Sequence, residues 1–314
     1  MNPRDLVDPE LLPLLDHQPD IVLDAASLLG ARTALPELFT GGQQPDLALA
    51  SLVVHQAGQV PVRVFTPIGG PEDTKHPVLL HIHGGGMVMG TAAMMDVQHA
   101  RLAAELGCVI ASVEYRLAPE NPFPAAIEDC YEALRWLHRH AAALAVDPTR
   151  IAVGGESAGG GLAASLALMA RDRGEVPIVF QHLIYPMLDD RTALTVEPGP
   201  HAGHFVWTRE KNRFGWRALL GNAAGGPDTS PYAAAARAAD LSGLPPAFIS
   251  VGALDLFIDE DIEYARRLIT AGVPCELHVF PGAYHGFDSA PQVRSAMVAR
   301  NRSRAALRRA LHPG

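Results

Sequence analysis

Short apolar runs recur along most of the chain, and longer segments with helical spacing separate the later ones. The short runs predict eight strands, at residues 51–55, 61–66, 78–82, 108–114, 151–154, 177–183, 247–251 and 275–280. The longer segments predict helices at 93–106, 124–142, 158–173, 257–272 and 289–310. Strands that alternate with helices form a mainly parallel sheet covered on both faces. The short link between the first two strands predicts that these two pair as an antiparallel hairpin.

Two regions depart from this alternation. Residues 11–29 are rich in leucine at helical spacing, and roughly sixty residues separate the strands near 183 and 247, with a helix predicted over 208–220. An insertion of that length in a compact domain is typically functional, although a surface insert without a role is the alternative. We therefore expect residues 1–47 and 188–225 to form a cap over the carboxyl edge of the sheet. The remaining segments, 48–187 and 226–314, are expected to form the core.

Composition narrows the class of protein. The chain has 34 Asp and Glu against 25 Lys and Arg, a formal net charge of −9, which argues against nucleic acid or an anionic membrane as a partner. Its three cysteines form no CxxC pair and predict neither a disulfide framework nor a zinc cluster. The first residues are acidic and interrupted by prolines, unlike a signal peptide, and no apolar run reaches the length of a membrane span. We expect a soluble cytoplasmic protein.

The strongest chemical motif is Gly-Glu-Ser-Ala-Gly at residues 155–159, between a predicted strand and a predicted helix. A serine on a sharp strand-to-helix turn needs glycine on both sides, because neighbouring backbones approach too closely for a Cβ. The N-terminus of the following helix favours negative charge at the reacting centre. The motif predicts Ser157 as a nucleophile; a glycine-rich turn whose serine only caps the helix is the alternative. Glu156 either orients this turn or a cap residue, or is a solvated carboxylate.

A second motif, His-Gly-Gly-Gly at residues 83–86, follows the strand predicted at 78–82. Glycines let the backbone turn its N–H groups toward an oxyanion that develops on a substrate carbonyl. The candidate donors are the N–H groups of Gly84, Gly85, Gly86 and Ala158. His83 is interpreted as a residue that orients this loop rather than as a base. His81 and His83 could form a metal pair, but no acidic residue nearby completes a site, so no metal is expected.

A serine nucleophile needs a base, and a carboxylate to hold that base. His285 lies in the loop between the last predicted strand and the last predicted helix, where an imidazole can reach the edge of the sheet. Asp255 follows the strand at 247–251 and is expected at the same edge. The rival carboxylates, Asp259, Glu260 and Asp261, begin the next helix, where acidic residues ordinarily face the helix dipole as first-turn charges.

Taken together, these motifs resemble those of the bacterial hormone-sensitive-lipase-like esterases (family IV), a branch of the α/β-hydrolase fold. The matching segments are His-Gly-Gly-Gly at 83–86 and residues 114–129, 154–163, 242–260 and 271–288, in the order of the family. The resemblance implies a mostly parallel eight-stranded sheet with a helical cap. It also implies a triad of Ser157, Asp255 and His285.

Several positions depart from the family pattern. Met87 stands where an aromatic residue is usual, Gly161 where many members have Asn, and Ile258 where Arg is usual. These departures concern the shape of the substrate pocket rather than the reaction. The candidate pocket residues are Met87, Phe205, Trp207 and Tyr284, and ordinary core packing is the alternative for them.

The resemblance implies a serine carboxylesterase that hydrolyses short- to medium-chain esters through an acyl-enzyme, with no metal or cofactor. The alternatives are an amidase or formamidase, an interfacial lipase, and a non-catalytic receptor on the same fold. The last predicted strand is an expected sheet edge, and an exposed edge favours a homodimer.

Overall fold

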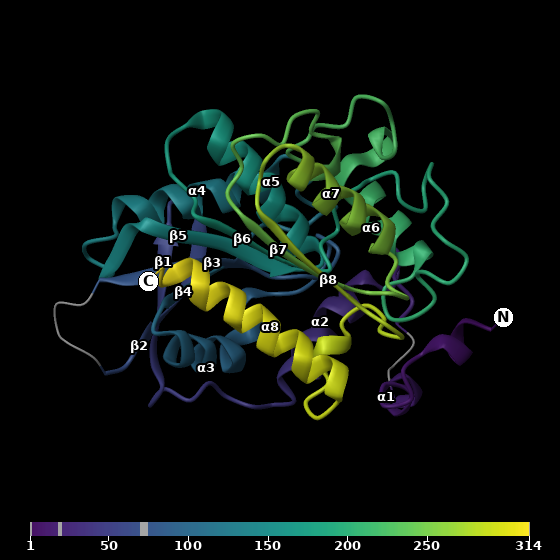
Figure 1. Ribbon diagram of the computed structural model, residues 1–314, viewed down its shortest axis with the longest axis horizontal. Helices are drawn as coiled ribbons and strands as arrows, with labels where there is room; N and C mark the ends of the chain where they lie inside the picture. The colour runs from purple at the N-terminus through teal and green to yellow at the C-terminus, as the bar shows by residue number, and fades with distance from the viewer. Residues whose placement is uncertain (1, 18–20, 70–74, 314) are drawn as a thin grey trace.

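The computed structural model describes residues 2–17, 21–69 and 75–313, and within these ranges eight strands form one sheet (Figure 1). The strands are β1 (Ala50–Ala57), β2 (Val60–Pro67), β3 (His76–Ile82), β4 (Val109–Val113), β5 (Val146–Glu156), β6 (Phe180–Ile184), β7 (Ala247–Gly252) and β8 (Cys275–Phe280). Their order across the sheet is β1-β2-β4-β3-β5-β6-β7-β8. All eight strands predicted from the apolar runs are present.

The pairing of the strands is mixed. β1 and β2 form the predicted antiparallel hairpin, in which Ala57 lies opposite Val60, and β2 also pairs antiparallel with β4. From β4 to β8 every neighbouring pair is parallel. The carboxyl ends of the parallel strands therefore meet at one edge of the sheet, where ligands of open α/β sheets ordinarily bind.

Helices cover both faces of the sheet. Those of the core are α3 (Asp96–Leu106), α4 (Ala125–Arg139), α5 (Ala158–Arg173), α7 (Ile258–Thr270) and α8 (Arg294–Leu311). The others are α1 (Leu12–His17), α2 (Leu28–Thr40) and α6 (Arg209–Leu220). Short 3₁₀ turns occur at Pro3–Leu6, Ala92–Met95, Gly221–Ala223, Ala235–Arg237 and Phe287–Ser289.

Alternation along the central strands explains the two layers of core. On β3, Val78 and Leu80 pack with residues of α4, α5 and α7, whereas Leu79 packs with residues of α3 and α8. Successive side chains of a strand point to opposite faces, so a strand buried on both sides is apolar throughout. Figure 1 shows α4, α5 and α7 on one side of the sheet and α3 and α8 on the other.

The helical spacing of the leucines at 11–29 corresponds to two helices rather than to one continuous helix. The described residues there form the short helix α1 and then an irregular segment, and α2 begins only at Leu28; residues 18–20 lie outside the described ranges. The Asp24 carboxylate accepts hydrogen bonds from the N–H groups of Ala26 and Ser27, at 2.9 and 2.8 Å. A side chain that satisfies these otherwise free N–H groups favours the start of a new helix at this point.

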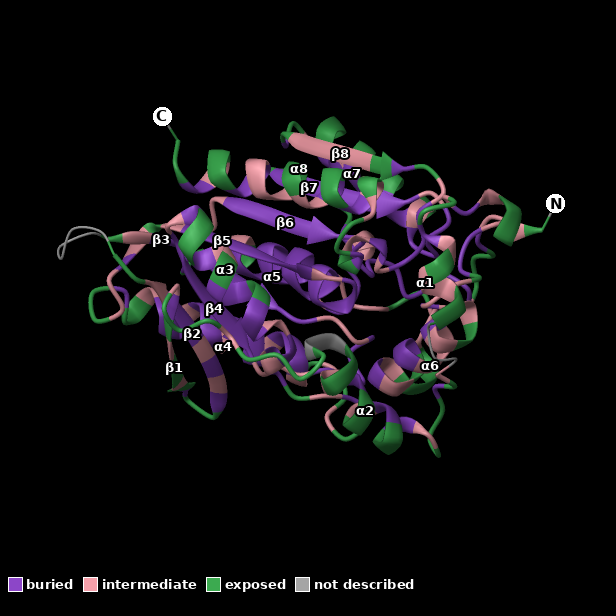
Figure 2. Cartoon of the chain, turned by 90° about the horizontal axis from the view of Figure 1, so that it is seen from below, coloured by how far each residue is buried: buried purple, intermediate pink, exposed green. Residues whose placement is uncertain are grey.

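The N-terminal helices and the insertion lie at the same end of the molecule. Figures 1 and 2 show α1, α2 and α6 at the end toward which the parallel strands run. Thr208 begins α6 as predicted, and its hydroxyl accepts a hydrogen bond from the N–H of Lys211. A groove of about 600 Å³ separates α6 from the start of α2. Among the described residues, no helix is long and apolar enough to cross a membrane.

Candidate active site

Ser157 occupies the turn between β5 and α5. Its φ is +57° and its ψ is −121°, a strained conformation typical of a nucleophile on a strand-to-helix turn. A Cβ on Gly155 would lie 2.1 Å from the carbonyl oxygen of Ile82, and one on Gly159 would lie 1.9 Å from the same atom. The backbone of β3 therefore leaves room only for glycine at both positions, as the motif predicts.

The three residues of the expected triad lie within hydrogen-bond distance of one another. His285 Nε2 is 2.9 Å from Ser157 Oγ, and His285 Nδ1 is 2.8 Å from Asp255 Oδ2. The three side chains come from the ends of β5, β7 and β8, which meet at the carboxyl edge of the sheet. All three residues are buried, with exposed fractions of 6% for Ser157, 7% for His285 and 1% for Asp255. This geometry matches the expectation from the sequence, and a nucleophile, a base and an orienting group have this arrangement in serine hydrolases.

Aromatic rings fix the imidazole of His285 from two sides. The Tyr185 ring lies edge-on at 4.7 Å, and the Phe257 ring does so at 5.3 Å. Tyr185 has a positive φ of 36°, and its hydroxyl donates a hydrogen bond to Asp288 at 2.7 Å. Tyr185 was not among the residues predicted from the sequence. Its position immediately after β6, at the edge that carries the triad, is the signal that could have found it.

The glycine loop at 83–86 lies against Ser157. A Cβ on Gly84 would lie 2.9 Å from the carbonyl oxygen of Glu156 and 3.4 Å from Cβ of Ser157. Among the described residues, none accepts a hydrogen bond from the N–H groups of Gly84, Gly85, Gly86 or Ala158. Unpaired N–H groups on both sides of a serine can stabilise an oxyanion.

His83 lies beneath this loop and is fully buried. Its Nδ1 donates to the carbonyl oxygen of Gly84 at 2.8 Å, and its ring stacks on Tyr115 at 4.2 Å. The Tyr115 hydroxyl in turn donates to the carbonyl oxygen of His83 at 2.9 Å. Burial lowers the pKa of His83 to about 4, because it disfavours the protonated form. His83 is therefore neutral near pH 7 and holds the loop, in agreement with the interpretation from the sequence.

Glu156 contacts the sheet rather than a cap residue. Its carboxylate lies 2.9 Å from Nε2 of His81. His81 belongs to β3, the strand beside β5 in the sheet. Burial raises the pKa of Glu156, but the charge and the hydrogen bond of His81 bring it below its usual value. Of the two roles considered for Glu156, the geometry favours orientation of the turn.

The four candidate pocket residues separate into three environments. Trp207 lies on Gly86, as described below, and its ring is 6.4 Å from that of His285. Phe205 and Tyr284 pack against each other at 6.0 Å, and the Tyr284 hydroxyl donates to the carbonyl oxygen of Leu11. Met87 is buried in the core shared with α4 and α5. Trp207 is therefore the candidate in direct contact with the oxyanion loop.

The N-terminal segment braces the loop that carries His285. Besides the bond from Tyr284 to Leu11, the N–H of Asp8 donates to the carbonyl oxygen of Gly282 at 3.0 Å. The Glu10 carboxylate accepts a hydrogen bond from the N–H of Arg294 at the start of α8. Residues from the two ends of the chain thus form one support for the histidine loop.

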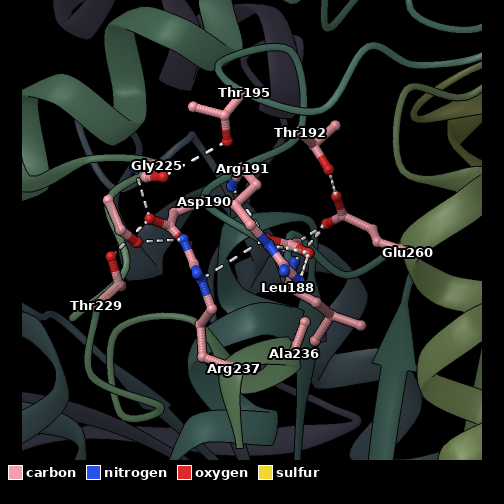
Figure 3. A network of polar contacts seen from close by, with 12 residues as sticks. Leu188, Asp190, Arg191, Thr192, Thr195, Gly225, Thr229, Ala236, Arg237 and Glu260 are labelled. Carbon is pink, nitrogen blue, oxygen red and sulfur yellow. Dashed lines mark hydrogen bonds and ion pairs between the residues drawn. The ribbon is translucent and has the colours of Figure 1, made fainter.

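Two of the acidic first-turn residues of α7 are buried rather than exposed at the helix end. Glu260 and Asp261 are buried, with exposed fractions of 8% and 0%. Glu260 accepts hydrogen bonds from the N–H groups of Leu188 and Asp189 and from the Thr192 hydroxyl (Figure 3). Burial raises the pKa of both acids well above the usual range, because it disfavours the carboxylate. Both residues lie in the first turn of α7 as expected, and the insertion in addition covers Glu260.

A second polar group joins the beginning and the end of the insertion. Asp190 is fully buried and pairs with Nε of Arg237 at 2.6 Å (Figure 3). The same carboxylate accepts hydrogen bonds from the N–H of Gly225 and from the hydroxyl of Thr229, both at 2.7 Å. A buried charge that is paired and fully hydrogen-bonded holds a segment in one position.

Comparison with known proteins identifies the family. The family described as "alpha/beta hydrolase fold" matches residues 79–289 of the chain. This match covers the glycine loop, the nucleophile turn and both other members of the expected triad. The chain therefore belongs to the α/β-hydrolase fold family.

Its relatives extend over nearly the whole chain. Esterase LipI of Mycobacterium tuberculosis is 37% identical over 309 residues, covering 98% of this chain and 96% of that protein. Carboxylesterase NlhH of the same species is 38% identical over 315 residues, with 98% and 97% covered. Among solved structures, a bacterial heroin esterase is 41% identical and superposes with a TM-score of 0.90, with 98% and 99% covered. These relatives confirm the expected family and the expected class of reaction, carboxylic ester hydrolysis.

Proposed function

We propose that the protein is a serine carboxylesterase in which Ser157 is the nucleophile, His285 the general base and Asp255 the residue that orients the imidazole. The observation that carries this proposal is the pair of contacts made by His285, at 2.9 Å to Ser157 Oγ and at 2.8 Å to Asp255 Oδ2. A nucleophile, a base and an orienting carboxylate in this geometry activate a hydroxyl that is otherwise weakly nucleophilic.

The reaction proceeds in two halves. Ser157 Oγ attacks the ester carbonyl carbon while its proton passes to His285 Nε2, and the carbonyl electrons move onto the oxygen. The N–H groups of the glycine loop and of Ala158 stabilise that oxyanion. When the intermediate collapses, the leaving alcohol takes the proton from His285 and an acyl-enzyme remains. Water, deprotonated by His285, then attacks the acyl group and releases the acid and free Ser157.

The substrate class follows from the enclosure of the site. Ser157 and His285 are nearly inaccessible, and Trp207 lies directly over Gly86 of the loop. A site of this kind favours small esters with short to medium acyl chains over interfacial lipid. The cap contributes to this enclosure through Trp207, which lies on Gly86, and through Leu11, which accepts a hydrogen bond from Tyr284 next to His285.

The first test is hydrolysis of p-nitrophenyl esters from acetate to palmitate, with and without a serine-directed organophosphate. We expect turnover to peak at short chains and to be lost as Ser157 becomes labelled. A maximum at the long, insoluble esters would support the interfacial lipase instead. Faster turnover of the matched anilides would support an amidase, and a chain that is neither active nor labelled would support the receptor.

Replacement of the nucleophile gives a direct prediction. Ser157→Ala should lower kcat by at least about 10⁴-fold, because no other group at this position can form the acyl-enzyme. The apparent Tm should not fall, because alanine removes only the hydroxyl oxygen and leaves the packing and the turn unchanged. Retained activity in this variant would remove Ser157 from its role.

Two expectations about the surroundings of the enzyme accompany this proposal. Cys108, Cys130 and Cys275 are free thiols, which supports a cytoplasmic location. β8 is an edge strand, and its Val279 side chain is exposed, which supports a homodimer through this edge. Light scattering should then give twice the chain mass of 33.4 kDa, and a monomeric mass would contradict the dimer.

A further inference from the structure

The insertion rests directly on the oxyanion loop. A Cβ placed on Gly86 would lie 2.1 Å from Cη2 of Trp207 and 2.7 Å from its Cζ2, so the indole covers this glycine. A Cβ placed on Gly215, within α6, would lie 2.9 Å from the carbonyl oxygen of Gly86. Trp207 and Gly215 of the insertion therefore lie so close to the backbone of Gly86 that neither Gly86 nor Gly215 has room for a side chain.

Buried hydrogen bonds fix the indole in this place. Trp207 Nε1 donates to Oδ1 of Asn212 at 3.2 Å, and Nδ2 of Asn212 donates to the carbonyl oxygen of Thr192 at 2.8 Å. Asn212 is fully buried and Trp207 is 4% exposed. The Thr192 hydroxyl donates to Glu260 on α7, the helix that follows Asp255. One line of contacts thus connects the oxyanion loop, the insertion and the helix next to the triad acid.

The backbone before Trp207 is strained. Val206 has a φ of +60°, a left-handed conformation that is an outlier for a β-branched residue. Lys211 Nζ donates to the carbonyl oxygen of Val206 at 2.7 Å. Strain of this kind persists only where the surrounding contacts overcome it, and it clusters at functional sites. At this position the strain accompanies a turn that places Trp207 on Gly86.

We propose that Trp207 is a positioning residue for the oxyanion hole: its indole, held by Asn212, fixes the Gly86 backbone where its N–H stabilises the oxyanion. This inference rests on the proposed esterase function. It assigns to the cap a part in the chemical step, beyond its part as a wall of the substrate pocket. A loop that moves away from the oxyanion loses transition-state stabilisation while it binds the ground state nearly as well.

The test compares variants of two buried tryptophans in the insertion. Trp207→Phe and Trp207→Leu remove the contact with Gly86, and Asn212→Leu removes the hydrogen bond that holds the indole. Trp216→Phe is the matched control, because Trp216 is fully buried in α6 while the three atoms nearest to a Cβ on Gly86 all belong to Trp207. The measurements are kcat and KM for p-nitrophenyl acetate, the inhibition constant of a trifluoromethyl ketone, and the Tm.

Both Trp207 variants should lose about 10- to 100-fold in kcat with KM changed less than about threefold, since displacement of catalytic groups by about 1 Å costs on the order of 10²-fold. The trifluoromethyl ketone forms an adduct with Ser157 that carries an oxyanion. Its inhibition constant should therefore rise by the same factor by which kcat/KM falls. Asn212→Leu should act in the same direction with a smaller effect. Trp216→Phe should keep kcat within about twofold of the wild-type value, although its loss of Tm should be comparable to that of the Trp207 variants.

Three outcomes would overturn the inference. They are an unchanged kcat in the Trp207 variants, a change confined to KM, and an equal loss of kcat in Trp216→Phe. If the wild-type chain hydrolyses esters and is labelled at Ser157, any of these outcomes overturns the inference alone. A wild-type chain that does neither overturns the proposed function and this inference with it.

Discussion

Two buried clusters of titratable side chains lie on either side of the triad, and they differ in chemistry. Toward α3 and α8 the cluster consists of histidines: His81 contacts His99 at 4.3 Å between ring centroids, and Nε2 of His182 contacts Ser303 at 2.7 Å. Toward α7 and the insertion the cluster consists of carboxylic acids, Glu260 and Asp261. The first cluster touches the nucleophile turn through Glu156, and the second lies beside Asp255.

One physical cause acts in both clusters with opposite consequences. Burial disfavours charge, so it lowers the pKa of a histidine and raises that of a carboxylic acid. Burial therefore disfavours the charged forms of His99 and His182 in the first cluster and of Glu260 and Asp261 in the second. Falling pH opposes the folding of the first pair, and rising pH opposes the folding of the second. The buried histidines therefore limit the stability of this region at low pH, and the buried carboxylic acids limit it at high pH.

The largest expected effect comes from breaking the buried ion pair between Arg237 and Asp190, beside the acidic cluster. Arg237→Met removes the partner of Asp190, which is fully buried, and leaves a carboxylate without a counter-charge. We expect the free energy of unfolding to fall by about 3–5 kcal/mol at pH 7. Urea unfolding at pH 7 measures this loss, and a loss of less than about 1 kcal/mol would contradict this interpretation of the pair.

The histidine cluster predicts a loss of stability in acid. Burial lowers the pKa of His182 to about 4, so between pH 6.5 and pH 4 the unfolded chain binds a proton that the folded chain does not. Stability contributed by His182 is therefore complete above pH 6.5 and falls by about 3 kcal/mol as the pH reaches 4. The His182→Asn variant should lose correspondingly less stability over this range than the wild type. Identical slopes for the two proteins, measured by urea unfolding, would contradict the prediction.

The acidic cluster predicts the reverse dependence. Burial raises the pKa of Asp261 well above its usual value, so the folded chain keeps a proton that the unfolded chain releases above about pH 4. This stability is present below pH 4 and declines as the pH rises, by at most about 1.4 kcal/mol per unit. The Asp261→Asn variant has no charge to bury at this position. Its free energy of unfolding, relative to that of the wild type, should therefore increase from pH 4.5 to pH 7.5. A gain that does not change with pH, measured by guanidinium unfolding, would exclude titration of Asp261 as its cause.

The placement of Ser157, Asp255 and His285 at one edge of the sheet could be predicted from the sequence because its constraints are local. Ser157 requires glycines at 155 and 159, and the apolar runs place the ends of β5, β7 and β8 at one edge. The burial of Glu260 could not be predicted in the same way. At the start of a helix an acidic residue looks like a favourable first-turn charge, and only the folded insertion brings Leu188 and Thr192 onto it.

The remaining differences have a similar origin in contacts between distant segments. The leucines at 11–29 have helical spacing, but the Asp24 side chain forms a turn that divides them, and their partners lie far along the chain. Tyr185 was missed because its role depends on Asp288 and His285, about a hundred residues later. Patterns of hydrophobic spacing report local periodicity and carry no information on such pairs.

The support that the N-terminal segment gives to the histidine loop has a consequence for how the protein is made. Leu11 is synthesised long before its partner Tyr284, which lies 273 residues later, and the contact between Glu10 and Arg294 spans 284 residues. Pairings of such long range close late, after most of the domain has formed around its local contacts. During synthesis, residues 8–11 cannot make these contacts until residues 282–294 have been made. A chain interrupted between these segments lacks this support for the loop that carries His285.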